Sequence, residues 1–149
     1  MNSFSFCIPT KTEFGVDKCD LAGHLCAEAG AKRVLLHFGA VDQRATVFVN
    51  GKNVGNHRGG YTAFSFDITD MLVAGENSIA VYCEGDARDK KQPSGKQSDR
   101  YASYGCFYTR STGIYAPVWL ETVPATYLTA IKLDPDTDNS RLFCELTLS

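Results

Sequence analysis

The sequence lacks long apolar runs and has no strong excess of one charge. No apolar window reaches the roughly 18 residues of a membrane-spanning helix, so we expect no membrane span. The formal net charge of −2, without a basic cluster, argues against nucleic-acid binding. The 149 residues are too few for a barrel of eight strands and eight helices, which needs about 250. One globular domain of ordinary composition remains as the expectation.

Motifs for metals, cofactors and nucleophiles are missing too. No two cysteines have the short spacing of a zinc or redox motif, the three histidines lie far apart, and no phosphate loop or glycine-flanked serine is present. We therefore expect no metal, no cofactor and no catalytic residue in this chain. The first ten residues also lack a basic leader, which favours a reduced, cytoplasmic protein. In a reduced protein we expect the six cysteines to be small buried side chains: Cys7, Cys19, Cys26, Cys83, Cys106 and Cys144.

The first 36 residues read as strand, helix, strand. Apolar residues alternate from Phe4 to Ile8, and the spacing from Asp17 to Ala29 predicts a helix with Asp17 as N-cap and Gly30 at its end. A buried strand is expected from Arg33 to Phe38. This segment therefore predicts a short β-α unit.

The remainder is typical of an all-β domain. Ala45 to Asn50 alternates, and Asn50-Gly51 predicts a tight hairpin. One helical turn is expected within Asp67 to Leu72, closed by Gly75. Further strands are predicted at residues 62–66, 78–84, 117–121, 127–133 and 141–148. Short strands separated by turns indicate a β-sandwich.

A long polar segment, Gly85 to Arg100, interrupts the strands, and loops of this length are often functional. From Gly95 to Tyr115 basic and amide side chains mix with aromatic rings, which suits the stacking and hydrogen bonding of sugars. The alternative is that these rings merely cover the end of the sandwich. Trp119 is expected in the core or at a domain interface.

The chain from Val34 to about Thr126 resembles the N-terminal sugar-binding domain of family 2 glycoside hydrolases, of the β-galactosidase, β-glucuronidase and β-mannosidase type. The matching elements are FGAVD, ATVFVNG, VGNHRGGYTAFSFDIT, GENSIAV, GKQ and YTRSTGIYAPVWLE. The resemblance implies a mainly β, jelly-roll sandwich related to galactose-binding domains for residues 34–126. It also implies that residues 127–149 begin an immunoglobulin-like domain. The catalytic glutamates of the family belong to a downstream barrel.

The resemblance also implies roles for particular residues. Lys96, Gln97, Tyr108 and Arg110, together with Gly95 and Gly113, would lie at the sugar-binding edge of the active site. Structural roles at the rim would fall to Asp42, His57 and Tyr61, with Gly59 and Gly60.

Residues 1–36 depart from that family. They resemble the start of iron-containing alcohol dehydrogenases, which implies a chimera whose junction falls in the strand at Arg33 to Phe38. The aromatic-arginine strands that usually open the sugar-binding domain are missing. Their absence predicts an uncovered sheet edge near Ile114 to Glu121, through which the chain would self-associate.

Three functions remain open at this point. The first is a non-catalytic carbohydrate-binding or scaffold fragment of a family 2 glycosidase, which would be inactive alone. The second is a truncated iron-dependent dehydrogenase, and the third is a structural module without a ligand. In the first case its partner is a β-linked glycan or the catalytic barrel.

Overall fold

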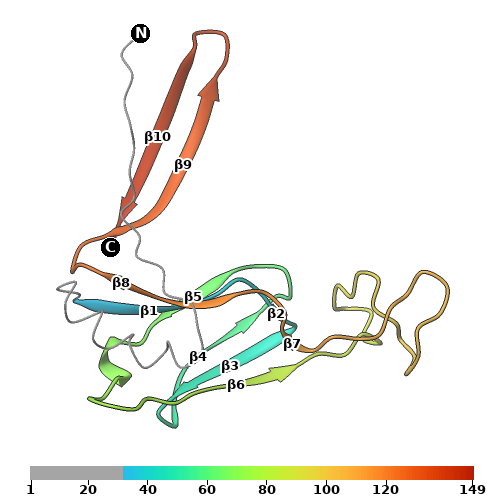
Figure 1. Cartoon of the computed structure of the whole chain (residues 1–149). Helices are drawn as coiled ribbons and strands as arrows, with labels where there is room; N and C mark the ends of the chain where they lie inside the picture. The colour runs from blue at the N-terminus through green and yellow to red at the C-terminus, as the bar shows by residue number, and fades with distance from the viewer. Residues whose placement is uncertain (1–31) are drawn as a thin grey trace.

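The computed structural model describes residues 32–149, which fold mainly into β-strands (Figure 1). The predicted strand at residues 4–8 and the predicted helix at residues 17–29 lie outside the described residues. The strands are β1 (Arg33–Phe38), β2 (Val41–Asp42), β3 (Arg44–Val49), β4 (Lys52–Arg58), β5 (Phe64–Asp67), β6 (Ile79–Glu84), β7 (Gly113–Ile114), β8 (Val118–Val123), β9 (Leu128–Asp136) and β10 (Arg141–Leu148), with one 3₁₀ turn, η2 (Thr69–Met71).

Two three-stranded antiparallel sheets form the sandwich. One has the order β5-β1-β8 and the other β4-β3-β6, while β2 pairs with β7 at the end where the long loop emerges. The expectation of a mainly β sandwich is therefore confirmed. Neither β2 nor β7 was predicted, because each is two residues long and is defined only by the pairing of Val41 with Ile114 and of Asp42 with Gly113.

The core lies between the two sheets. Alternate residues of β1 and β3 point inward, as the period of two in a strand requires. The buried apolar side chains of the cluster are Val34, Leu36, Phe38, Val41, Ala45, Val47, Val49 and Ile68. Non-directional burial of these side chains is the main stabilising contribution within the described part of the chain.

The hairpin between β3 and β4 turns at Asn50-Gly51, as predicted. Both residues have positive φ, 50° and 76°, which Asn and Gly tolerate better than other residues. The Asn50 amide donates to the Met71 carbonyl oxygen at 2.9 Å, and its Oδ1 accepts from the Ser78 N–H at 2.9 Å. One side chain thereby ties the hairpin to the segment around η2, the predicted helical turn.

The β9–β10 hairpin projects away from the sandwich (Figure 1). Its two faces differ, because register pairs Leu133 with Cys144 and Ile131 with Leu146 on one face, and Lys132 with Glu145 on the other. At its base the Ser149 N–H donates to the Tyr127 carbonyl oxygen at 2.9 Å, and the Tyr127 N–H donates to Ser149 Oγ at 3.2 Å.

Two expectations about core side chains are corrected by the structure. Cys106 and Cys144 are exposed, the first in the long loop and the second on the apolar hairpin face, while Cys83 is half-buried. Burial raises the pKa of the Cys83 thiol. Trp119 is 45% exposed and is not a core residue, because it lies on the face of β8 that points away from the facing sheet. Its placement at a domain interface stays a prediction.

Candidate functional site at the loop end of the sandwich

The segment from Gly85 to Thr112 connects β6 to β7 and lies at one end of the sandwich (Figure 1). Its own hydrogen bonds give it structure. Ser98 is fully buried, and its hydroxyl donates to the Ala102 carbonyl oxygen at 2.7 Å and accepts from the Arg100 N–H at 3.0 Å. Tyr104 and Phe107 exchange backbone hydrogen bonds and their rings stack, with centroids 5.2 Å apart. The loop thus holds its aromatic residues in place.

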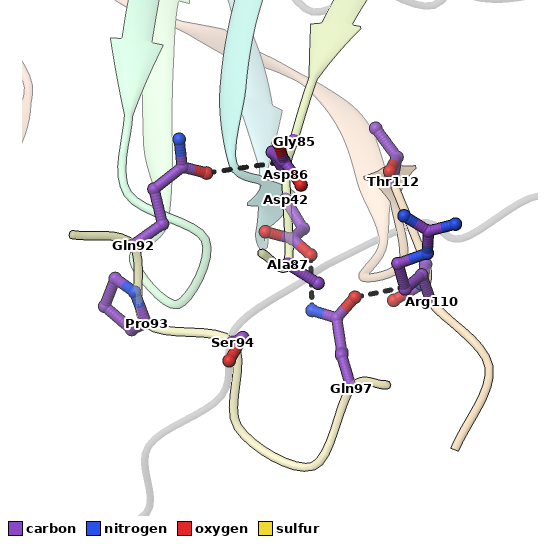
Figure 2. A pocket seen from close by; sticks show the side chains of 11 residues that line it. Asp42, Gly85, Asp86, Ala87, Gln92, Pro93, Ser94, Gln97, Arg110 and Thr112 are labelled. Carbon is purple, nitrogen blue, oxygen red and sulfur yellow. Dashed lines mark hydrogen bonds between the residues drawn. The ribbon is translucent and has the colours of Figure 1, made fainter. Parts of the chain in front are cut away.

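Gln97 joins this loop to the sandwich. Its Nε2 donates to Asp42 Oδ2 at 2.7 Å, and its Oε1 accepts from the Ser111 N–H at 3.0 Å. Figure 2 shows the Gln97 side chain between Asp42 and the segment that carries Arg110. Asp42 is only 8% exposed, and a buried carboxylate requires hydrogen-bond donors. The amide of Gln97 supplies one.

A second set of hydrogen bonds fixes the turn before Tyr61. Gln43 is buried, and its Oε1 accepts from the Gly60 N–H at 2.8 Å, while its carbonyl oxygen accepts from the Gly59 N–H at 2.9 Å. The Tyr115 hydroxyl donates to the Gly60 carbonyl oxygen. Gly59 has a φ of 138°, a conformation that side-chain-bearing residues rarely adopt. The turn therefore places Tyr61 next to Tyr115.

Between the loop and this turn lies an open groove of about 290 Å³. That volume is near the lower end of small-molecule sites, about 300 Å³. Exposed tyrosine rings and polar groups make up its walls: Asp42, Tyr61, Ser94, Lys96, Gln97, Tyr108, Thr109, Ser111 and Tyr115. Flat rings and hydrogen-bonding groups line the same open space, which suits a polar ligand with apolar C–H faces.

The long loop also carries charged side chains with close partners of their own. The hydrogen bond from Arg88, with the charge of Arg88 adding to it, holds the pKa of Asp86 below its usual value. The Arg110 guanidinium lies over the Tyr101 ring, 4.9 Å from its centroid, and that of Arg100 over Tyr104 at 4.0 Å. Lys96 has no ion-pair partner among residues 32–149. Lys96 itself lines the groove.

Within the described residues, no cluster of three potential metal ligands occurs, and no helix is long and apolar enough to cross a membrane.

Comparison with known protein families assigns the chain. Residues 18–124 match the model described as "Glycosyl hydrolases family 2, sugar binding domain". The chain belongs to this family.

Relatives of this sugar-binding domain include a β-galactosidase of Thermoanaerobacter pseudethanolicus, 43% identical over 101 residues that cover 65% of this chain and 12% of the relative. A β-glucuronidase of Bacteroides fragilis is 44% identical over 68 residues, covering 45% of this chain and 10% of the relative. The chain therefore spans about a tenth of the length of the curated relatives it matches.

Solved structures of the family share the fold. A β-glucuronidase from Bacteroides uniformis superposes with a TM-score of 0.51 at 37% identity, covering 65% of this chain and 10% of that one. A β-glucuronidase from an uncultured Clostridium superposes with a TM-score of 0.63, covering 82% of this chain and 22% of that one. Its identity is 24%, so it shows the fold alone.

The sugar-binding domain brings together most of the residues chosen from the sequence. Lys96, Gln97 and Tyr108 line the groove with Asp42 and Tyr61. Arg110 borders a small adjoining cavity that it shares with Asp42 and Gln97 (Figure 2). Gly95 packs beside the Tyr61 hydroxyl, and Gly113 pairs with Asp42.

His57 lies outside the groove lining. Its ring stacks on Phe64 with centroids 4.1 Å apart, and its Nε2 lies 3.0 Å from Thr62 Oγ1. The structural role of His57 at the rim stays a prediction.

Gln43 and Ser111 are parts of the site that the sequence analysis does not predict. Tyr115 lines the groove and belongs to the aromatic stretch that the sequence predicts to suit sugars. The contributions of Gln43 and Ser111 depend on contacts across more than ten residues.

Proposed function

We propose that the groove binds a β-linked glycan and forms one border of the active site of a family 2 glycosidase. The observation that carries this proposal is the meeting of Tyr61, Tyr108 and Tyr115, each more than half exposed, around a groove that also presents Lys96. Tyrosine rings stack on the C–H faces of sugars, and a lysine ammonium group donates hydrogen bonds to their hydroxyls. Arg110 would extend the polar contacts at one end.

The relatives indicate which sugars to examine. Their names are β-galactosidase and β-glucuronidase, so we propose a terminal galactose or glucuronate unit as the ligand. The hydrolytic step would belong to the catalytic barrel that the family resemblance implies, and this chain would supply binding. We accordingly expect no hydrolysis of nitrophenyl β-glycosides by the isolated chain.

The segments before and after the sugar-binding domain, residues 1–36 and 127–149, raise separate questions. We propose that the β9–β10 hairpin begins an immunoglobulin-like domain, because one of its faces carries exposed apolar residues and the other carries Lys132, Asp134 and Glu145.

The resemblance of residues 1–36 to alcohol dehydrogenases falls mainly outside the described residues, and the family match begins within that segment, at residue 18. No contact among residues 32–149 favours the dehydrogenase alternative.

The proposed partner at β8 is a second copy of the chain. Among residues 32–149, β8 pairs with β1 on one side only and ends its sheet. Val118 and Leu120 on its core-facing side are exposed. An unpaired edge with apolar side chains is a template for strand pairing.

Binding to the full chain is tested by titration with methyl β-galactoside, methyl β-glucuronide and methyl β-mannoside, followed by NMR chemical shifts. We expect weak binding, in the millimolar range, because a small open groove encloses only part of one sugar. Tyr108→Ala should abolish it. Tyr82→Ala is the matched control, since Tyr82 on β6 is 60% exposed, close to the 65% of Tyr108, and does not line the groove.

Two outcomes would overturn the proposal. Equal binding by the wild-type chain and Tyr108→Ala would move the site away from the groove. No shift with any of the glycosides would favour the alternative of a structural module.

A further inference from the structure

Gln97 occupies the point where three separate segments meet. Its amide joins Asp42 of β2, 55 residues away, to the Ser111 backbone just before β7. One N–H of the amide and one lone pair of its oxygen are thus engaged within the protein, although the sequence predicts Gln97 as a residue at the sugar-binding edge.

The backbone on each side of Gln97 is bonded to Tyr108. The Tyr108 N–H donates to the Lys96 carbonyl oxygen at 2.8 Å, and the Ser98 N–H donates to the Tyr108 carbonyl oxygen at 2.7 Å. Gln97 and Tyr108 thereby form an isolated parallel bridge. A displacement of Gln97 would move Lys96 and Tyr108 with it.

The opposite wall of the groove is held by a different set of hydrogen bonds. The Gly60 N–H donates to Gln43 Oε1, which fixes the turn before Tyr61. The Tyr115 hydroxyl donates to the Gly60 carbonyl oxygen, which holds Tyr115 against the same turn. The width of the groove depends on where the loop wall is attached to the sandwich. The bond between Gln97 and Asp42 is the side-chain hydrogen bond that attaches it beside the groove.

We propose that Gln97 is a positioning residue: its amide, bonded to Asp42 and Ser111, sets the positions of Lys96 and Tyr108 against Tyr61 and Tyr115. This inference rests on the proposed function of the groove as a glycan site. Gln97 acts through its neighbours and does not itself bond the sugar. The buried carboxylate of Asp42 makes the bond strong, because hydrogen bonds to charged groups are stronger than neutral ones.

The positioning role of Gln97 is tested by exchanging the donor at position 97 with the acceptor at position 42. Gln97→Glu places a second carboxylate against Asp42 and removes the donor, so affinity for methyl β-galactoside should fall by about tenfold or more. The double variant combines Gln97→Glu with Asp42→Asn, so the amide introduced at position 42 donates to one oxygen of the carboxylate at position 97. The other carboxylate oxygen accepts from the Ser111 N–H. Affinity should return to within about threefold of wild type.

Gln92→Glu provides the matched control. Gln92 belongs to the same loop, and its amide also bonds in both directions, accepting from the Asp86 N–H at 3.3 Å and donating to Asp89 at 3.2 Å. Gln92 lines the small adjoining cavity but not the groove itself. Because its amide does not attach Lys96 or Tyr108 to the sandwich, its substitution should change affinity by less than about twofold.

Amide hydrogen exchange without ligand separates this inference from the proposed function. The Ser98 and Tyr108 N–H groups should be protected in the wild type and the double variant and should exchange faster in Gln97→Glu. If no glycoside binds but this exchange pattern holds, the function of the groove fails while the attachment of its wall by Gln97 stands. Unchanged affinity and exchange in Gln97→Glu, or no recovery in the double variant, would overturn the inference.

Discussion

The imidazole ring of His37 stacks on the indole ring of Trp119, with centroids 4.9 Å apart and planes 6° from parallel. The two residues are register partners on β1 and β8. They lie on the face opposite Val34, Leu36 and Phe38, which explains why Trp119 is outside the core. The buried Nε2 of His37 lies 3.0 Å from Glu121 Oε2, without the geometry of a hydrogen bond.

This stacking predicts a modest role for Trp119 in stability. Trp119→Ala should lower the free energy of unfolding by about 1 kcal/mol, the value of an exposed aromatic pair. Phe38→Ala, in the fully buried core, should cost about 3–5 kcal/mol. Urea unfolding of the three chains measures both effects, and equal losses would show that Trp119 is packed as tightly as a core residue.

Self-association through β8 predicts a concentration-dependent dimer. Leu120→Lys places a charge on the exposed, core-facing side of this edge strand and should shift the chain toward monomer. Light scattering after size-exclusion chromatography measures the mass. Tyr82→Lys is the control, because β6 is the edge of the other sheet. A stable wild-type monomer contradicts the prediction, and dissociation by Tyr82→Lys alone would assign the interface to β6.

The side chain of Asn50 should contribute to stability beyond its tolerance of positive φ. Asn50→Gly preserves the turn but removes the bonds to Met71, Asn77 and Ser78, so we expect a loss of about 1–3 kcal/mol. Asn53→Ala, an exposed position on the adjacent strand, should change the free energy of unfolding by less than about 0.5 kcal/mol. Thermal unfolding compares the three, and similar values for both variants would contradict the role of the Asn50 amide.

Asp67 should make stability depend on pH in the acid range. Burial raises the pKa of its carboxyl, but hydrogen bonds from Thr69 and the charge of Arg33 outweigh burial and hold the pKa below its usual value. A lowered pKa in the folded state stabilises the protein above the unfolded pKa, near 3.9. That contribution is lost as pH falls through the folded pKa.

Asp67→Asn should therefore be less stable than wild type at neutral pH, with a difference that narrows below about pH 4. Urea midpoints across the acid range provide the measurement. Asp70→Asn is the control, because Asp70 is exposed in η2 and has no side-chain hydrogen bond among the described residues. If the difference in urea midpoint between wild type and Asp67→Asn stays constant with pH, the titration of Asp67 does not cause the acid sensitivity.

Local signals predicted the strands well. Asn50-Gly51 defines its hairpin through φ preferences of two adjacent residues, and the alternation in β3 follows from one buried face. The pairing of β2 with β7 has no such signal, because a strand of two residues is too short to show an alternation of apolar and polar side chains. Burial of Cys106 and Cys144 was predicted wrongly, since residue type alone does not say whether another layer covers the position.

The candidate site was predictable in composition and not in arrangement. Lys96, Gln97 and Tyr108 were named from a resemblance, and they do line one groove. The inward direction of the Gln97 amide depends on Asp42, which lies 55 residues earlier. No property of either residue in the sequence specifies that contact.

The closure of the β9–β10 hairpin at its base has a mechanical consequence. Tyr127 and Ser149 are bonded to each other at the same end of the antiparallel pair, so tension applied between the sandwich and residue 149 meets the interstrand bonds one at a time. Bonds met one at a time open at low force, whereas bonds strained together resist. Under tension the hairpin would unzip from Ser149 toward its tip before the core between the two sheets opened.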